Sequence, residues 1–408
     1  MFRTIAYLDS IIYWSLVLIP FFVGIAPAPV SVFSGFFIAA LVTKRIVQKK
    51  PLFASNAASF PFLAFFSVTC LSLVNSVSLG DSLKGGVLRL LQYGFIMLGI
   101  AQEVKDSRHL RLIVGSMAAG VVFASFDSLW QVAFGHDLVR HWQPEQLLGL
   151  IRAKGSFKDP NTLGVYLSAF TPVCAAFTLW YARGKARAAA FLLSAVVLGG
   201  IALTYSRPTL LAVFIALLFM GLVRRDRWLL SVLALMVVIS PFITPKSVRE
   251  WTRSVGYDPL RVMCNDDRIA IFKNALNMIR HNPVLGVGAN TFMKNYQKYK
   301  ESPEYRGVVT SDYCYAHNNF LHMAGETGLV GLGLFLWFLA ALFMHAGRVY
   351  TESADPFVRV VSLAVTACLI AFLVNGLTES SLYSSRVAVV FWYLAGLQLC
   401  MGKWRYEK

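Results

Sequence analysis

The sequence predicts an all-α integral membrane protein, a bundle of about 12 transmembrane helices, from its composition and from the spacing of its apolar runs. Hydrophobic residues occupy 57% of the 408 positions and charged residues only 14%, which is far too apolar for a soluble protein of this length. Apolar runs of about 17 to 28 residues recur along the chain, and a helix of that length crosses a hydrocarbon layer of roughly 30 Å. Residues 1–408 are therefore expected to form a single polytopic membrane domain.

Short connections separate these runs, except for one long segment, 245–317, between the ninth and tenth. The runs lie at 8–26, 30–47, 59–78, 84–102, 110–134, 162–182, 187–205, 207–223, 227–244, 318–345, 357–378 and 384–402. The first run lacks a small-residue cleavage site after a short apolar core, so we expect a span there and not a signal peptide.

Basic residues in short connections predict the orientation of the spans. If the N-terminus is cytoplasmic, every inner connection carries at least two basic residues, such as Lys44 and Arg45 or Arg224 and Arg225. An even number of spans then returns the C-terminus to the same side. Both termini are expected to be cytoplasmic.

Eight other basic residues fall in short connections or helix ends on the outer side, where the charge rule does not favour them. An anionic ligand would account for them, because clustered cations match phosphate groups; contact with anionic lipid headgroups is the alternative. These residues are Lys84, Arg89, Arg140, Arg152, Lys154, Lys158, Arg207 and Arg386.

Two of these outer segments define the predicted position of their cations closely. One segment is the run Arg152-Ala-Lys-Gly-Ser-Phe-Lys-Asp-Pro-Asn161. It is expected to form a basic segment above the membrane surface, with a glycine that lets the backbone approach a ligand, or to be the start of a helix capped at Asp159 or Asn161. The connection Thr204–Pro208 is so short that it holds Arg207 near the outer membrane boundary. Arg207 is expected either to contact a ligand or to pair with a carboxylate such as Asp127 or Glu379.

The segment 245–317 is expected to be one large outer loop with helices of its own. Its clearest helix begins at Asn265–Asp267 and runs through Arg280, with Arg268 in the first turn and an apolar stripe at Ile269, Phe272, Leu276 and Ile279. A glycine-bearing turn, Pro283–Asn290, follows it. Cys264 and Cys314 are the two cysteines of this segment, and in an oxidising compartment a disulfide between them is a hypothesis.

The stretch Tyr313–Leu321 joins this loop to the tenth apolar run, and His317 lies at its centre. A histidine at a helix N-terminus tends to be neutral, the form that accepts a proton, so His317 is a candidate for chemistry at the membrane surface. The alternative is that it only caps the helix. Glu326 lies within the tenth run and is expected to form a structural salt bridge.

These motifs, in this order, resemble the bacterial O-antigen ligase family, within the O-antigen ligase/polymerase superfamily of membrane glycosyltransferases. The resemblance rests on the Arg152–Asn161 run, the Ser206-Arg207 turn, Arg268 followed by Pro283–Gly288, and His317-Asn318 with Leu321 and Glu326. It covers most of the chain from about residue 60 to 400.

The resemblance implies a GT-C-like helix bundle in the bacterial inner membrane, with residues 245–317 as a periplasmic loop. It implies transfer of a glycan from undecaprenyl diphosphate to a sugar hydroxyl of the lipid A core in the periplasm, as a step of lipopolysaccharide assembly. The reaction would invert the anomeric centre and need no metal or other cofactor, and no metal-ligand cluster appears in the outer segments. Nucleic acid is not expected as a partner.

Roles for individual residues follow from the same comparison. His317 would accept the proton of the attacking hydroxyl, while Arg207 and Arg268 would stabilise the diphosphate. Further contacts with the diphosphate or acceptor are expected from Arg152, Lys84, Arg89, Arg386, Asn161, Asn318 and Tyr315.

Three other functions stay open. An O-antigen or exopolysaccharide polymerase would use a lipid-linked glycan as acceptor, and a protein-directed oligosaccharide ligase would use a protein. A transporter or flippase of an anionic lipid is the alternative outside the enzymes, although no inverted repeat with broken helices is evident.

Overall fold

The computed structural model describes all residues except 1, 148, 245, 265, 301–314 and 406–408. Within the described chain, ten helical segments are long and apolar enough to cross a membrane. The predicted runs at 59–78 and 227–244 form shorter apolar helical segments, Ser59–Asn75 and Arg227–Phe242. The all-α membrane class is therefore confirmed, while the count of twelve spans stays a prediction.

The apolar helices follow the predicted runs closely. They are α1 (Phe2–Val23), α2 (Pro27–Gln48), α3 (Ser59–Leu71), α5 (Leu88–Glu103), α6 (Ser107–Phe134), α7 (Pro160–Ser168), α8 (Thr171–Ala176), α9 (Gly184–Thr204), α10 (Arg207–Arg224), α11 (Arg227–Ile243), α16 (Asn319–Glu352), α17 (Pro356–Asn375) and α18 (Ser385–Cys400). Two of them have π-helical extensions: α4 (Leu79–Asp81) and η2 (Ser82–Val87) lead into α5, and η3 (Phe177–Tyr181) continues α8.

Short elements complete the chain. They are η1 (Ser72–Asn75), η6 (Ser381–Tyr383), η7 (Met401–Arg405), the antiparallel strands β1 (Glu145–Leu147) and β2 (Leu150–Arg152), and, between α11 and α16, α12 (Lys246–Ser254), α13 (Pro259–Met263), α14 (Asp266–His281), α15 (Phe292–Tyr296) and η4 (Gln297–Tyr299).

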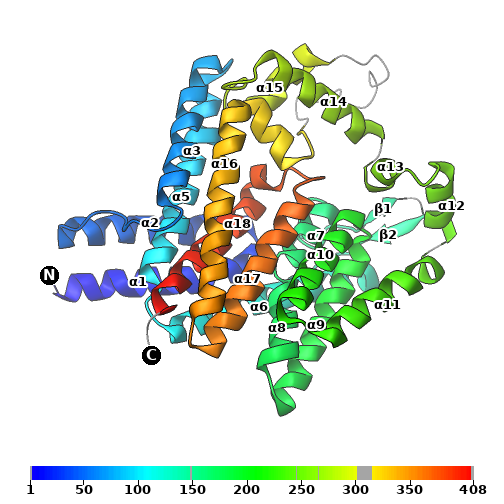
Figure 1. The fold of residues 1–408 in the computed structure, drawn as a ribbon, viewed down its shortest axis with the longest axis horizontal. Coiled ribbons are helices and arrows are strands. Elements are labelled where there is room, and N and C mark those ends of the chain that lie inside the picture. Colours follow the sequence, from blue (N-terminus) through cyan, green and yellow to red (C-terminus); the bar gives the residue numbers. More distant parts are fainter. Residues whose placement is uncertain (1, 148, 245, 265, 301–314, 406–408) are drawn as a thin grey trace.

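The centre of the bundle is formed by α17 and α18. Helix α18 packs against α5, α17 packs against α10 and α8, and α16 packs against α3, as Figure 1 shows. All residues from Arg386 to Cys400 are buried. By contrast, α9 and α11 expose large apolar side chains such as Phe191, Leu192 and Val238, which is the surface that a helix presents to lipid.

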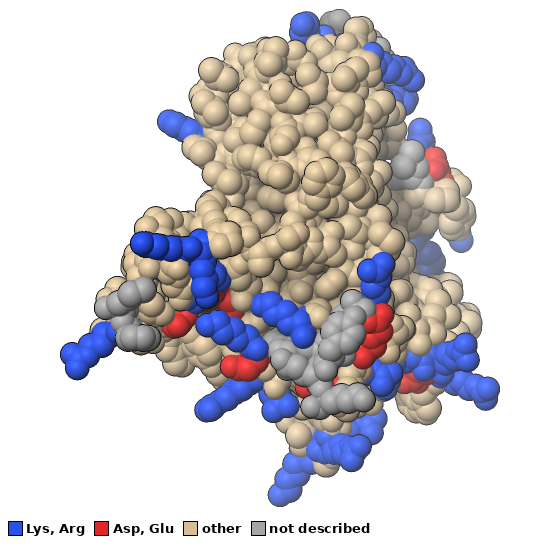
Figure 2. Space-filling model, turned by 60° about the vertical axis from the view of Figure 1, so that its left-hand side comes forward, with Lys and Arg blue, Asp and Glu red and all other residues tan. Residues whose placement is uncertain are grey.

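Charged side chains lie mainly at the ends of the bundle. In Figure 2, Lys and Arg gather in the lower part of the molecule, below a broad surface with few charges. Among the basic residues, Lys44 donates to Asp9 and, with Arg45, to the buried Glu103. Both carboxylate oxygens of Glu103 accept a charge-assisted hydrogen bond there, which offsets part of the cost of burying its charge.

The segment between α11 and α16 crosses one end of the bundle (Figure 1). Helix α14 forms where predicted, but only part of its predicted apolar stripe is buried: Ile279 is buried, and Ile269 and Phe272 are partly exposed. Ile271, Ala275 and Met278 are buried, whereas Leu276 is exposed. The helix packs on α16 and on the segment that carries Phe292 and Tyr296. This contact buries a face of α14 that is rotated by about one residue from the predicted apolar stripe.

The glycine-bearing turn 283–290 inserts beside a break in α16. Val287 N–H donates to the Gly325 carbonyl at 2.9 Å and Leu329 N–H donates to the Pro283 carbonyl at 2.7 Å. Gly328 is non-helical, with φ 72°. A Cβ on Gly286, which also has positive φ, would lie 2.4 Å from the backbone of Glu326. The turn therefore satisfies the backbone groups that the broken helix frees.

Candidate functional site

A polar cavity of about 310 Å³ lies where the start of α16 meets the segment that follows α17. Its wall is rich in hydroxyl and charged groups. The lining residues are Arg89, Lys158, Asp159, Thr162, Val165, Tyr315, His317, Glu379, Ser380, Ser381, Tyr383, Ser384, Ser385 and Val387. The cavity thus brings together four segments that are far apart in the sequence.

His317 reaches this cavity from the residue before the cap of α16. Its φ of 47° is in the left-handed region, which is uncommon for a residue with a side chain. Asn318 caps the helix: its side-chain oxygen accepts from the N–H groups of Phe320 and Leu321, and its amide donates to the Leu377 carbonyl. The cap is Asn318, so His317 itself is not needed for that role and its ring lies beside the cavity, 35% exposed.

Glu379 connects His317 to Arg268. Its Oε2 lies 3.5 Å from His317 Nδ1, while its Oε1 accepts from Arg268 Nη2 at 2.6 Å. Arg268 also donates to the Thr378 carbonyl at 2.8 Å. Burial raises the pKa of Glu379, but the charge of Arg268 and the contact with His317 outweigh burial and lower that pKa below its usual value. Glu379 is therefore ionised at neutral pH.

This carboxylate also favours one tautomer of His317. An ionised Glu379 with Oε2 3.5 Å from Nδ1 favours the tautomer that carries its hydrogen on Nδ1. That tautomer leaves Nε2 without a hydrogen and able to accept a proton. The same logic places the carboxylate behind the histidine in a Ser-His-Asp triad. The tautomer is assigned here from the position of Glu379.

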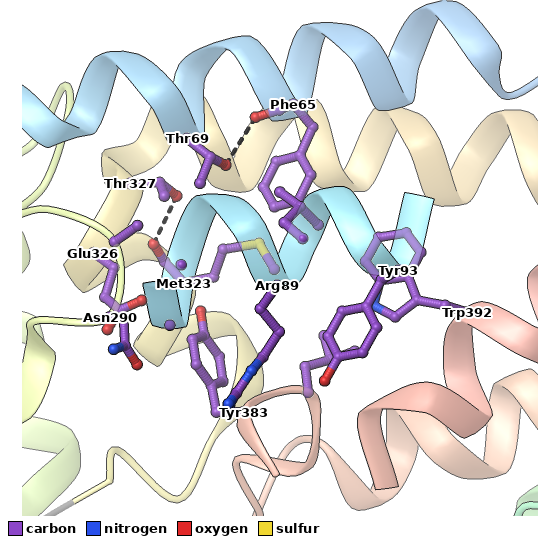
Figure 3. Close-up of a pocket in the computed structure, with 15 residues that line it drawn as sticks. Phe65, Thr69, Arg89, Tyr93, Asn290, Met323, Glu326, Thr327, Tyr383 and Trp392 are labelled. Carbon is purple, nitrogen blue, oxygen red and sulfur yellow. Dashed lines mark hydrogen bonds between the residues drawn. The ribbon is translucent and has the colours of Figure 1, made fainter. Parts of the chain in front are cut away.

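A second, narrower cavity of about 80 Å³ adjoins the first. Figure 3 shows it between α3, α5, α16 and α18, with Phe65, Tyr93, Met323 and Trp392 in its wall. Arg89 and Tyr383 line both cavities. A polar chamber and an apolar chamber therefore meet at one arginine.

Arg89 is the cation whose placement best fits the prediction of ligand contact. Its half-buried side chain points into the space between the two cavities, beside Tyr383 (Figure 3). No hydrogen bond or ion pair joins its guanidinium to any residue that the structure describes. An arginine in that condition is costly within a bundle unless water or a ligand meets it.

Two other predicted ligand contacts are held by the protein. Arg152 donates to the Thr204 carbonyl, to Glu145 and to Asn161, each at 2.9 to 3.0 Å. Arg386 donates to the Val23 carbonyl and twice to Ser156, and its guanidinium lies 3.6 Å from the centre of the Phe157 ring. Both side chains are buried, and neither lines either cavity. Their hydrogen bonds hold separate segments of the chain together.

Arg207 lies close to these groups without lining either cavity. It donates to the Val262 carbonyl, and the charges of Arg268 and Arg152 both act on it. Glu379, one of its two expected partners, accepts from Arg268 instead. Pro208 occupies the predicted first turn of α10. Lys84, by contrast, is exposed on η2 and outside both cavities.

Of the remaining predicted residues, some hold other side chains in place and one lines the polar cavity. Asn161 accepts from Arg152, and Asp159, not Asn161, caps α7. Tyr315 lines the polar cavity. Glu326 pairs with a histidine and not with an arginine: its Oε1 lies 3.2 Å from His322 Nε2 and accepts from Phe292 N–H.

His322, Tyr383 and Ser380 were not expected in the site. The rings of His322 and Tyr383 stack with centroids 3.6 Å apart, and His322 Nδ1 lies 3.3 Å from Ser380 Oγ. His322 follows His317 by five residues, so it lies more than one helical turn further into α16. The spacing alone does not reveal its partners, because these come from the segment after α17.

The structure tests the predicted disulfide and the expected absence of a metal site only in part. Cys264 is a buried free thiol, and burial raises its pKa above the usual value despite the positive charges of Arg268 and Arg207. Its expected partner, Cys314, lies outside the described residues. Among the residues that the structure describes, no three His, Cys, Asp or Glu side chains are grouped so that they could hold a metal ion.

Comparison with known proteins gives one family. Residues 189–336 match the family model Wzy_C, described as O-Antigen ligase. The matched segment includes Arg207, Arg268, the turn 283–290 and His317, and the match supports a function of O-antigen ligase or polymerase type. No curated protein matches the chain.

Proposed function

Since this membrane protein belongs to the O-antigen ligase family through residues 189–336, we propose that it is an O-antigen ligase. It would transfer a glycan from undecaprenyl diphosphate to a sugar hydroxyl of the lipid A core, on the periplasmic side of the bacterial inner membrane. The observation that carries the proposal is the junction of a polar cavity holding His317 and Glu379 with an apolar cavity at Arg89.

The two cavities fit the two parts of such a donor. The apolar chamber, with Phe65, Met323 and Trp392, suits the first isoprene units of the lipid. The diphosphate would lie at Arg89, whose guanidinium matches phosphate oxygens. The sugar attached to it would then extend into the polar chamber, toward His317.

The transfer is a direct displacement at the anomeric carbon. The acceptor hydroxyl oxygen attacks that carbon, the bond from carbon to the diphosphate oxygen breaks, and undecaprenyl diphosphate leaves with the electron pair. His317 Nε2 takes the proton of the hydroxyl and later releases it to water. Attack opposite the leaving group inverts the anomeric centre.

Positive charge would stabilise the leaving diphosphate without a metal in this proposal. Arg89 contacts it, and Arg268 and Arg207 add positive charge behind Glu379. Glu379 offsets part of the Arg268 charge, so in this scheme Arg268 mainly holds Glu379 against His317. Arg152, Asn161 and Arg386 shape the walls, Asn318 fixes the start of α16, and Tyr315 stays a candidate for substrate contact. Lys84, exposed and outside both cavities, is given no contact in this scheme.

A reconstituted reaction tests the function. Purified protein is mixed with a glycan on undecaprenyl diphosphate and lipopolysaccharide lacking O-antigen, and the product is detected by a shift in gel mobility. We expect transfer at the same rate with and without chelator. Product on the carrier lipid instead of on lipopolysaccharide would identify a polymerase, and loss of the reaction in chelator would refute the metal-free mechanism.

Arg89→Gln is expected to raise the KM for the donor roughly ten- to 150-fold, because a charge-assisted contact with the diphosphate is worth roughly 1.5–3 kcal/mol. Donor titrations at saturating acceptor measure this change. Lys84→Gln is the matched control, since Lys84 lies on the adjoining π-helical turn and outside both cavities. An unchanged KM for the donor in Arg89→Gln would place the diphosphate elsewhere.

A further inference from the structure

A shallow hollow of about 590 Å³ opens beside the polar cavity. It is lined by His141, Trp142, Gln143, Pro144, Lys154 and Lys158. Lys158 lines both the hollow and the cavity of His317. The hollow and the cavity of His317 therefore share part of their wall at Lys158.

Buried polar side chains build this hollow. Asp137 is fully buried, and its carboxylate accepts from the N–H groups of Val139, Arg140 and Trp142 at 2.6 to 2.9 Å. Gln131, also buried, donates to the Trp142 carbonyl and accepts from the N–H groups of Lys154 and Gly155. The turn after α6 and the basic run are thus fixed to each other through one glutamine.

The resulting surface is positively charged and aromatic. Arg140 lies 4.5 Å and Lys154 5.6 Å from the centre of the Trp142 ring. Within the described chain, no carboxylate pairs with the side chains of Arg140, Lys154 or Lys158. Two nearby carboxylates bind other groups: Asp137 accepts hydrogen bonds from backbone N–H groups, and Glu145 pairs with Arg152.

His141 adds a sign that the turn is held in one shape. Its φ of 56° is left-handed, a conformation that costs free energy in a residue with a side chain and persists where the surrounding structure enforces it. The N–H groups of Arg140 and Trp142, on either side of His141, both donate to the Asp137 carboxylate and hold the turn there, and Trp142 is 36% exposed. A preformed surface loses less conformational entropy on binding than a mobile one.

We propose that this hollow binds the acceptor glycan through negatively charged groups, phosphate or carboxylate, on its sugars. The proposal rests on the proposed function and adds the chemical class of the acceptor. Arg140, Lys154 and Lys158 bind the anionic groups, and Trp142 supplies a flat apolar surface for a sugar ring. The neighbouring hydroxyl then lies in the polar cavity, where His317 takes its proton.

Two matched acceptors test this proposal. They are lipid-anchored oligosaccharides of one sequence, with and without phosphate groups on the sugars, used with wild type and with the double variant Arg140→Gln/Lys154→Gln. We expect the double variant to raise the KM for the phosphorylated acceptor roughly five- to tenfold. The KM for the neutral acceptor and the KM for the donor should change less than about twofold.

Two single variants serve as controls. Lys154→Arg keeps the charge and should retain most of the preference for the phosphorylated acceptor. Lys273→Gln removes an exposed cation from α14, away from the hollow, and should leave both KM values unchanged. Equal losses with both acceptors, or a rise in the KM for the donor, would overturn the proposal.

Lipid headgroups are the competing source of negative charge. The reactions are therefore repeated in vesicles of neutral phosphatidylcholine and of phosphatidylcholine with phosphatidylglycerol. If the double variant differs from wild type only in the anionic vesicles and equally for both acceptors, the hollow contacts lipid and the proposal is wrong. An effect in neutral vesicles with the phosphorylated acceptor alone supports it.

Binding without turnover separates this inference from the proposed function. Acceptor binding to the full chain in nanodiscs is measured by fluorescence of Trp142, with Trp142→Phe identifying its signal. Preference for the phosphorylated oligosaccharide, lost in the double variant, supports the hollow even if no donor is ever transferred. Equal binding of both oligosaccharides to wild type refutes the hollow, whatever the result of the transfer assay.

Discussion

Replacing His317 with alanine is expected to lower the rate of glycan transfer by a factor of about 10² to 10⁴, the usual contribution of a general base. The KM for the donor should change little, because in the proposed mechanism the donor is held by Arg89 and by the apolar cavity, which His317 does not line. Initial rates in the reconstituted reaction, at saturating donor and acceptor, measure the effect directly.

A loss of rate in His317→Ala could also come from misfolding, but the structure gives a reason to expect that the variant folds. The cap of α16 is Asn318, whose side chain accepts from two N–H groups, so His317→Ala keeps the helix start. His281→Ala, which removes a histidine from the end of α14, is the matched control and should retain wild-type rates. If His317→Ala stays within a factor of about ten of wild type, His317 only positions the acceptor.

Much of the fold could be predicted because membrane insertion depends on local features. A helix that crosses lipid must satisfy its own backbone groups within one continuous apolar run, so each run could be located from the sequence alone. The buried face of α14 could not, since Ile271 and Leu276 are both apolar and only the position of α16 decides which of them is buried.

For the arginines too, the sequence predicts where they lie but not what they contact. Their placement at one end of the helices was predictable, but their partners come from distant segments. Arg386 bonds to the Val23 carbonyl and Arg152 to the Thr204 carbonyl, and backbone acceptors leave no trace in a sequence. Arg89 looked like one outer cation among eight; its lack of a protein partner among the described residues emerges only from the packing of α5 against α18.

Glu379 was expected as a possible partner of Arg207, and its contact with His317 was missed. The two residues are 62 positions apart, so no local spacing connects them. Their approach depends on the N–H of Asn319 donating to the Gly376 carbonyl at 2.7 Å and on the side chain of Asn318 donating to the Leu377 carbonyl. These bonds join the start of α16 to the end of α17.

Glu379→Gln is therefore expected to slow transfer roughly tenfold to a hundredfold. The amide keeps the size of the side chain but removes the charge that orients His317 and stabilises its protonated form. Neutralising the carboxylate of a Ser-His-Asp triad costs about 10⁴; here the contact with His317 is long, at 3.5 Å, so a smaller loss is expected. The rate constant at saturating substrates should fall while the KM for the donor stays within a factor of about two.

Stability against pH gives an independent readout of the same carboxylate. Because the folded protein lowers the pKa of Glu379, its ion pair with Arg268 contributes stability above the ordinary carboxyl pKa of 4.5. That contribution is lost as pH falls through the lower, folded pKa. In thermal unfolding between pH 7 and pH 3, the wild type should lose this contribution on acidification, while Glu379→Gln should lack it at every pH.

Glu145→Gln separates the two roles of a carboxylate in this region. It removes an ion pair with Arg152 at a residue that lines neither cavity, so it tests stability without touching His317. If Glu379→Gln slows transfer no more than Glu145→Gln does, then Glu379 supports the fold alone. A larger loss of rate in Glu379→Gln than in Glu145→Gln, when the two variants are equally stable, assigns Glu379 to the orientation of His317.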